Sequence, residues 1–330
     1  MNAAPAAAGP APGPNPVPGP ARRPSGPAPA LLVVGEALVD VVVHPDGRSE
    51  EHPGGSPANV ALTLGRLGHA PRLLTAIGDD AAGQAVAAWL RDSHVDLDPR
   101  SVVPGPTSRA TARLDAAGAA RYDFDVRWNP PDVPAGDVDL VHVGSISALL
   151  APGAATVRRL VAEARPRALV SYDPNIRPAL VTDAAASRAA VEDLVAAADI
   201  VKVSDEDLAW LDRSAPPEAV AQRWLAAGPA AVVVTRGSEG ATAFTRAGAV
   251  WTAAPPVAVR DTVGAGDTFM GAFLAGLADR GLLDGGAAGR DRLRRLGAAE
   301  VEDLLGFSAA AAAVTVSRAG ADPPWRRELP

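Results

Sequence analysis

The sequence predicts a three-layer α/β fold, with a mostly parallel central sheet, helices on both of its faces and a small β-flap. Short β-branched runs alternate with Ala- and Leu-rich segments from residue 30 onward. The β-branched runs are apolar throughout instead of alternating, as strands covered on both faces are. Strand–helix alternation of this kind indicates parallel strands joined by helical crossovers.

Each expected strand is a short run rich in Val, Ile or Leu. In chain order these runs are Leu31–Val34, Arg72–Ala76, Leu140–Val143, Ala168–Tyr172, Ile200–Val203 and Ala231–Thr235. Each expected helix is a longer run rich in Ala and Leu: Ala58–Leu67, Ala82–Arg91, Ala154–Ala164, Ala184–Ala197, Pro217–Ala226, Gly266–Arg280 and Gly297–Val316. No internal repeat interrupts this order.

Two parts of the chain depart from the alternating pattern. Leu38–Val43 alternates only weakly, and Arg109–Leu114 and Arg121–Asp125 flank a short turn at residues 116–118, which predicts a hairpin. We interpret residues 38–53 and 107–127 as a β-flap at one edge of the main sheet, where it would act as a lid.

Composition excludes several classes of protein. The net charge of −7 gives no reason to expect a nucleic-acid or membrane-surface partner. The chain has no cysteine, which excludes disulfides, thiolate chemistry and Cys-type zinc sites. Its five histidines share no metal-ligand spacing, and apolar runs are too short to cross a membrane. These features predict a cytoplasmic protein.

Residues 1–29 have a different composition from the rest of the chain. Ten prolines lie there among Ala and Gly, and the charged side chains are Arg22 and Arg23. Proline interrupts every stretch that could serve as a secretory signal. A segment of this kind cannot bury a core, so we expect a disordered tail at 1–29 and one folded domain over 30–330.

The segment from Asp261 to Leu274 carries the clearest chemistry. Small residues, Gly264-Ala265-Gly266, lead directly into an amphipathic helix, whose first N–H groups can meet negative charge on a phosphoryl group. Asp267 follows at once, where a carboxylate could take a proton from an attacking hydroxyl. The alternative is that Asp267 only caps the helix, because capping aspartates are common.

A second segment, Pro53 to Ala61, places Gly54-Gly55 before another helix. Backbone amides there can meet a polyol, and the amide of Asn59 offers both a donor and an acceptor. Taken alone, this segment is better explained as a turn followed by a helix N-cap.

Together these segments resemble the PfkB-type, or ribokinase-like, sugar kinase family, and in particular its bacterial fructokinases. The resemblance runs in order from residue 31 to the end. Beside 54–68 and 261–274, its first and second signatures, it includes Val34–Asp40, Ile77–Asp80 with Gly83, Asp173–Pro178, Lys202–Asp207 and Thr235–Gly240.

The resemblance implies roles for individual residues. It implies that Asp267 is the general base and that Gly264, Ala265 and Gly266 form the anion hole. The sugar ligands would be Asp40, Gly55 and Asn59, and the nucleotide contacts Asn175, Thr235, Gly237 and Gly240. Mg²⁺ would be held through water by Asp207, and an activating K⁺ near Asp261 and Val263. One motif departs from the family: its Asn-x-x-Glu magnesium motif appears here as Ser204-Asp205-Glu206-Asp207.

Lys202 is the single lysine beside 30 arginines. The planar fork of arginine cannot replace a compact ammonium against a phosphate. We therefore expect Lys202 to position a nucleotide phosphate or a carboxylate. The alternative is that Lys202 is a solvated residue at the end of a strand.

These observations predict an ATP-dependent kinase that phosphorylates a primary hydroxyl, with D-fructose as the acceptor and fructose 6-phosphate as the product. Ribose and 2-keto-3-deoxygluconate are the alternative acceptors, the latter because Arg109 or Arg177 could pair with its carboxylate. A sugar-binding regulator without activity is the alternative of another class. A nicotinamide-dependent enzyme is set aside, because the first strand leads into one glycine, Gly35, instead of a Gly-x-Gly-x-x-Gly loop. ATP, Mg²⁺ and K⁺ are the expected cofactors, and two copies could pair through the lid.

Overall fold

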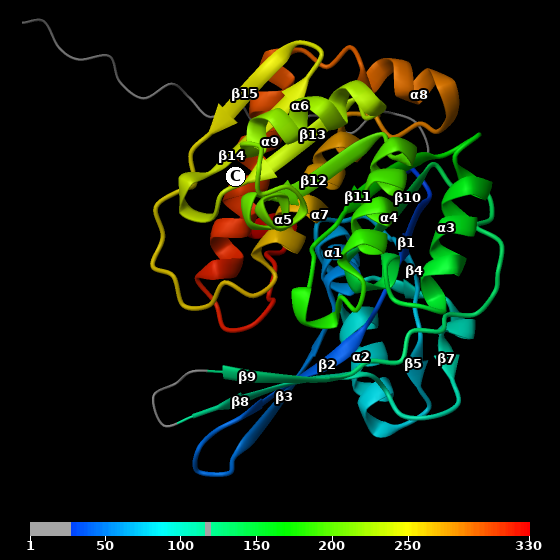
Figure 1. Cartoon of the computed structure of the whole chain (residues 1–330), viewed down its shortest axis with the longest axis vertical. Coiled ribbons are helices and arrows are strands. Elements are labelled where there is room, and N and C mark those ends of the chain that lie inside the picture. The colour runs from blue at the N-terminus through cyan, green and yellow to red at the C-terminus, as the bar shows by residue number, and fades with distance from the viewer. Residues whose placement is uncertain (1–27, 116–119) are drawn as a thin grey trace, which may run out of the picture.

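The computed structural model describes residues 28–115 and 120–330. Its centre is a nine-stranded sheet in the order β15-β14-β13-β12-β11-β10-β1-β4-β6 (Figure 1). From β13 to β6 all neighbours are parallel, and β14 and β15 are antiparallel additions at one edge. The prediction of a mostly parallel sheet is confirmed. The strands are β1 Leu31–Val34, β4 Arg72–Leu74, β6 Asp96–Leu97, β10 Leu140–Gly144, β11 Leu169–Asp173, β12 Ile200–Ser204, β13 Ala231–Thr235, β14 Ala241–Thr245 and β15 Gly248–Thr252.

Helices cover both faces of this sheet, which explains why its central strands are mostly apolar. Successive side chains of a strand point to opposite faces, so Val33 joins one core layer and Val34 the other. The first layer contains buried residues of α1 Ser56–Arg66, α2 Ala81–Asp92, α7 Ala265–Asp279, α8 Gly286–Leu293 and α9 Ala298–Val316. The second contains residues of α3 Gly153–Ala164, α4 Ala184–Ala197, α5 Asp205–Leu211 and α6 Pro217–Ala227.

A separate four-stranded sheet extends from one end of the molecule (Figure 1). Its order is β3-β2-β8-β9, formed by β3 Ser49–Gly54, β2 Leu38–Val43, β8 Arg109–Leu114 and β9 Ala120–Asp125. Val39 and Val41 pack against the first core layer, so Asp40 lies on the opposite face of the sheet. The predicted turn at 116–118 lies outside the described residues.

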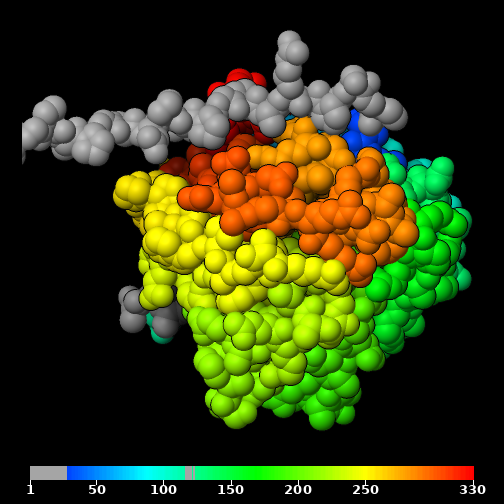
Figure 2. Space-filling view, turned by 90° about the horizontal axis from the view of Figure 1, so that it is seen from above, coloured from blue at the N-terminus to red at the C-terminus, as the bar shows by residue number. Residues whose placement is uncertain are grey.

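Seen from above, the opposite end of the molecule is closed by α8 in orange and by the yellow segments around β14 and β15 (Figure 2). Sequence patterns did not predict β3, β6, β14, β15, α5 and α8. β15 is largely exposed, so its burial pattern is weak. The remaining short strands are β5 Ile77–Gly78 and β7 Val102–Val103, which form a pair. Within the described residues, no helix is both long enough and apolar enough to cross a membrane.

Candidate active site

Asp267 lies in the first turn of α7, where its buried carboxylate faces the start of α1. Oδ1 accepts hydrogen bonds from Ser56 Oγ at 2.7 Å and from Asn175 Nδ2 at 3.3 Å. Oδ2 accepts one from Asn59 Nδ2 at 2.8 Å. These donors are side chains, whereas a helix cap would bind backbone N–H groups. Since a hydroxyl already lies within bonding distance of Oδ1, the geometry suits a base that receives a proton from an alcohol.

Ser56 is a site residue that the sequence analysis missed. It is the first residue of α1, and its hydroxyl both donates to Asp267 and accepts a hydrogen bond from Asn175 Nδ2 at 2.7 Å. Its position directly after Gly54-Gly55, at a helix start, was the available signal. The expected nucleotide residue Asn175 therefore lies beside the predicted base, and its φ of 36° is unusual for a residue other than glycine.

The small residues before Asp267 let the chain turn sharply into α7. Gly264 has a φ of 74°, and a Cβ on it would lie 2.5 Å from the Cβ of Ala321. The first α-helical bond of α7 runs from Thr268 N–H to the Gly264 carbonyl at 2.8 Å. N–H groups earlier in the turn have no such partner within the helix. The Ala265 N–H instead donates to the Thr262 carbonyl at 3.3 Å, so this N–H is already engaged.

Asp40 lies close enough to Asp267 for the two carboxylates to repel each other. Burial raises the pKa of Asp40 to about 6; the charge of Arg177 opposes this rise and the charge of Asp267 adds to it. The Asp40 side chain lies directly over Gly54, where a Cβ would come within 2.1 Å of Asp40 Oδ2. Gly55, with a φ of 107°, has no room for a Cβ either, because the Glu36 carbonyl oxygen would be 2.5 Å away. The double glycine thus brings strand β2 close to the start of α1.

Glu36, which follows β1, is a second residue that the sequence analysis did not assign. It is buried, and its Oε2 accepts a hydrogen bond from the Ser147 N–H at 3.2 Å. Burial raises the pKa of Glu36 to about 7, although Ser145, Ser147 and Arg177 favour its charged form. An acidic residue beside a buried strand of a parallel sheet was the available signal.

The two arginines expected near the sugar lie in different places. Arg177 follows β11 and donates a hydrogen bond to Asn175 Oδ1 at 2.6 Å. Its positive charge opposes the rise in pKa of both Asp40 and Glu36. Arg109 is paired in register with Val39, and Ala110 with Asp40. The Arg109 side chain therefore lies on the same face of the small sheet as Val39, opposite to the face of Asp40. Its guanidinium binds Glu51 at 2.6 Å. The structure therefore does not bring Arg109 to the other site residues, and we leave it out of the proposed site.

Lys202 and Asp173 form a buried ion pair beside α7. Lys202 Nζ donates to Asp173 Oδ2 at 2.7 Å, and a Cβ on Gly266 would lie 2.9 Å from this Nζ. Burial lowers the pKa of Lys202, but Asp173 and, further, Asp267 and Asp207 outweigh it, so the pKa is raised. Burial raises the pKa of Asp173 to about 6 against the effect of Lys202. The alternative of a solvated lysine at the end of a strand is thus wrong, because the Lys202 side chain is buried.

The other expected nucleotide and metal residues follow neighbouring parallel strands. Thr235 ends β13, next to β12, and Gly237 and Gly240 have φ values of 49° and 95° in the turn after it. Asp207 lies in α5, immediately after β12. Its Oδ1 accepts the Ile176 N–H at 2.9 Å, which ties α5 to the loop that contains Asn175. These residues therefore share the carboxyl edge of the sheet, the edge at which open α/β sheets bind ligands.

Asp261 links the segment before α7 to the segment after α9. Oδ1 accepts the Val263 N–H at 3.0 Å and Oδ2 accepts the Gly320 N–H at 2.8 Å. Val263 itself is exposed. In the described part of the chain, no cluster of three or more His, Asp or Glu side chains could hold a metal ion.

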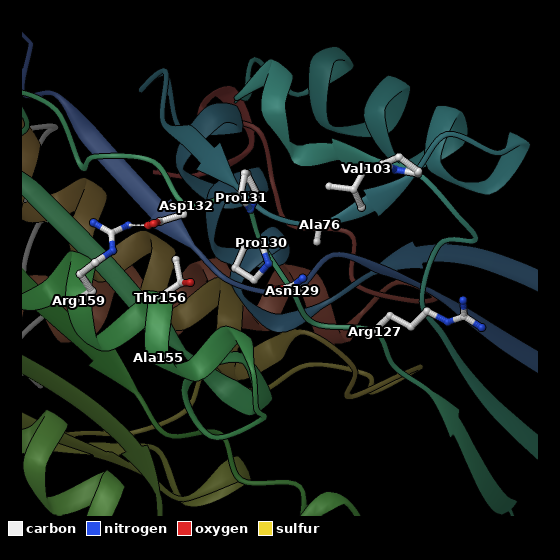
Figure 3. Close-up of a pocket in the computed structure, with 11 residues that line it drawn as sticks. Ala76, Val103, Arg127, Asn129, Pro130, Pro131, Asp132, Ala155, Thr156 and Arg159 are labelled. Atoms are coloured by element: carbon white, nitrogen blue, oxygen red, sulfur yellow. Dashed lines mark ion pairs between the residues drawn. The ribbon is translucent and has the colours of Figure 1, made fainter.

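A cavity of about 790 Å³ lies away from these residues (Figure 3). Ala76, Val103 and Pro131 line it, and Asp132 and Arg159 form an ion pair at one end with a separation of 2.6 Å. None of the predicted site residues belongs to its lining. We therefore place the candidate active site at the start of α7 and not in this cavity.

Comparison with known proteins agrees with this arrangement. The profile of the pfkB family carbohydrate kinases matches residues 29–327. A fructokinase of Rhizobium leguminosarum bv. trifolii is 36% identical over 259 residues, 75% of this chain and 79% of that protein. A fructokinase of Klebsiella pneumoniae is 35% identical over 268 residues, which cover 78% and 87%.

Solved structures give the same result. The crystal structure of a fructokinase from Xylella fastidiosa with bound ATP is similar with a TM-score of 0.75 and 27% identity, covering 91% of this chain and 95% of that one. A fructokinase from Vibrio cholerae O395, bound to fructose, ADP and a calcium ion, is similar with a TM-score of 0.73 and 25% identity, covering 89% and 94%. The family match over nearly the whole described chain leads to one conclusion: this protein belongs to the pfkB family of carbohydrate kinases.

Proposed function

We propose that this protein is an ATP-dependent sugar kinase that phosphorylates the primary hydroxyl at O6 of D-fructose. The observation that carries the proposal is the environment of Asp267. Its two carboxylate oxygens are oriented by Ser56, Asn59 and Asn175, and it lies at the positive end of a long helix. The fructokinases among its relatives support fructose as the acceptor.

In the proposed reaction, the sugar lies between α1 and the small sheet, with its hydroxyls on Asp40 and Asn59. Asp267 accepts the proton of the primary hydroxyl as this oxygen attacks the γ-phosphorus of ATP, and the bond to the ADP oxygen breaks. The N–H groups at 264–266 that remain available would hold the charge that builds on the phosphoryl oxygens. Within the part of the chain that the structure describes, Asn59 Oδ1 is buried without a hydrogen-bond partner, so an incoming hydroxyl could satisfy it.

The nucleotide would lie over the carboxyl ends of β11, β12 and β13, near Asn175, Lys202, Thr235, Gly237 and Gly240. Mg²⁺ would neutralise charge on the phosphates. Asp207 suits a contact through water, because one of its oxygens already accepts the Ile176 N–H and Mg²⁺ usually keeps several waters. A K⁺ near Asp261 and Val263 would rely on backbone carbonyls, since both Asp261 oxygens accept N–H groups.

The small sheet would act as a lid over the sugar. Asp40 projects from one face while Val39 and Val41 anchor the other face on the main domain. Closure would exclude water, so that ATP is not hydrolysed. The outer part of the sheet extends beyond the main domain (Figure 1) and offers a surface on which a second copy could pair.

One observation favours a second acceptor, 2-keto-3-deoxygluconate. The exposed guanidinium of Arg177 lies within electrostatic range of Asp40 and could bind a substrate carboxylate. The deciding experiment compares kcat/KM for fructose, ribose, 2-keto-3-deoxygluconate, tagatose and inosine. Fructose should give the highest value. Another acceptor that exceeds it by about tenfold, the effect of one lost contact, would refute fructose; absence of turnover with every sugar would refute the kinase.

A further inference from the structure

A buried ion pair lies under the first turn of α7, on the face of the main sheet that also contains His142 and Ser171. Asp173 ends β11 and Lys202 is in β12; Tyr172 pairs with Val201, so Asp173 lies beside Lys202. Ile200 and Leu169, which point to the same side of these strands, belong to the core layer that includes α7. The Lys202 and Asp173 side chains are only 5% and 1% exposed.

Stability does not explain a charged pair in this position. Replacing a buried ion pair by uncharged residues of similar volume is often neutral or stabilising, because both charges lose their hydration. Asp173 Oδ1 is in addition buried without a hydrogen-bond partner among the described residues, which is itself unfavourable. Because burial of such a pair is costly, a functional use explains it better than a contribution to stability.

The position of the ammonium suggests that use. A Cβ on Gly266 would lie 2.9 Å from Lys202 Nζ, so the ammonium is held directly behind the backbone of the anion-binding turn. The charges that act on Lys202 are the carboxylates of Asp173, Asp267 and Asp207. His142, one layer below on the same face, is uncharged because burial and Lys202 lower its pKa to about 3.

We propose that Asp173 is a positioning residue that holds the Lys202 ammonium behind Gly266, where it stabilises the charge that develops on the transferred phosphoryl group. The inference rests on the proposed kinase function, and it adds Asp173 to the residues on which turnover depends. Lys202 keeps its proton throughout; the proton of the attacking hydroxyl goes to Asp267. Asp173 serves to keep the flexible lysine stem in one conformation and to compensate its charge before ATP arrives.

The test separates this role from a structural one by removing both charges at once. Asp173→Asn and Lys202→Met, singly and together, are compared for melting temperature, kcat and the KM values of ATP and sugar. Each single variant leaves one buried group unpaired, so both should melt at lower temperature. The double variant should regain most of the melting temperature. Its kcat should remain lower by about 10²–10³-fold, as when one donor of an anion hole is removed, with the KM for sugar little changed.

The matched control is a second largely buried ion pair, which joins the residue before β12 to helix α8 at the opposite end of that strand. Asp199 precedes β12, and Arg290 Nε binds its Oδ1 at 2.9 Å. Asp199→Asn with Arg290→Met should alter the melting temperature and leave kcat close to wild type. A charge-free Asp173/Lys202 pair with wild-type kcat, or one that cannot fold, would overturn the inference. Wild-type protein without turnover on any sugar would instead overturn the proposed function, so the two failures are distinguishable.

Discussion

Replacing Asp267 by Asn tests the base directly, because the structure indicates how well an amide fits there. The amide oxygen can accept from Asn59 Nδ2, and the amide nitrogen can donate to Ser56 Oγ if that hydroxyl rotates. Only the contact with Asn175 Nδ2, at 3.3 Å, then becomes a donor facing a donor. One lost hydrogen bond corresponds to about 1–3 kcal/mol, which is less than the usual stability of a folded protein, about 5–15 kcal/mol.

We therefore expect Asp267→Asn to fold and to bind ATP, while kcat falls by about 10²–10⁴-fold through loss of the base. The assay is sugar-dependent ADP formation, with calorimetric ATP binding and melting temperature measured on the same sample. Asp183→Asn is the control: Asp183 caps α4 by accepting the Ala185 and Ala186 N–H groups, and asparagine caps equally well. Near-normal kcat in Asp267→Asn would mean that Asp267 only stabilises the helix.

Three further predictions follow from the acidic groups near Arg177. The folded-state pKa of Asp40 is about 6, so the KM of the wild type for sugar should rise as pH falls below that value. Asp40→Asn should show a higher KM without this pH dependence. Parallel pH profiles of the two proteins would refute the role of Asp40 in sugar binding. Gly54→Ala, whose Cβ would lie 2.1 Å from Asp40 Oδ2, should raise the KM for sugar more than the KM for ATP, and equal changes would contradict this. Glu36 binds its proton more tightly in the folded state, so the free energy of unfolding falls as pH rises from 4.5 to about 7. Glu36→Gln should avoid this loss of about 3 kcal/mol. A variant whose melting temperature depends on pH as the wild type's does would refute this prediction.

Much of the fold could be predicted because its signals are local. The apolar runs at β1, β10, β12 and β13 are short and buried on both faces, so composition alone marks them as strands. The start of α7 was equally visible, because the glycines on either side of Ala265 leave room that larger residues would fill. The exposed strand β15 and the polar helix α8 lack such a signal, since their residues face solvent.

The sequence by itself determined which chemical groups the protein has and where along the chain they lie: the aspartate at a glycine-rich helix start, the double glycine and the single lysine. The tertiary structure decided which of them meet. Ser56 and Asp267 are 211 positions apart, and their contact depends on how α1 packs against α7. Arg109 was placed in the sugar site from its chemistry, yet strand register turns it to the other face. Lys202 was expected to meet phosphate or carboxylate, but its partner Asp173 comes from a neighbouring strand. Register and helix packing arise from the burial of the whole core, so no local pattern could reveal these contacts.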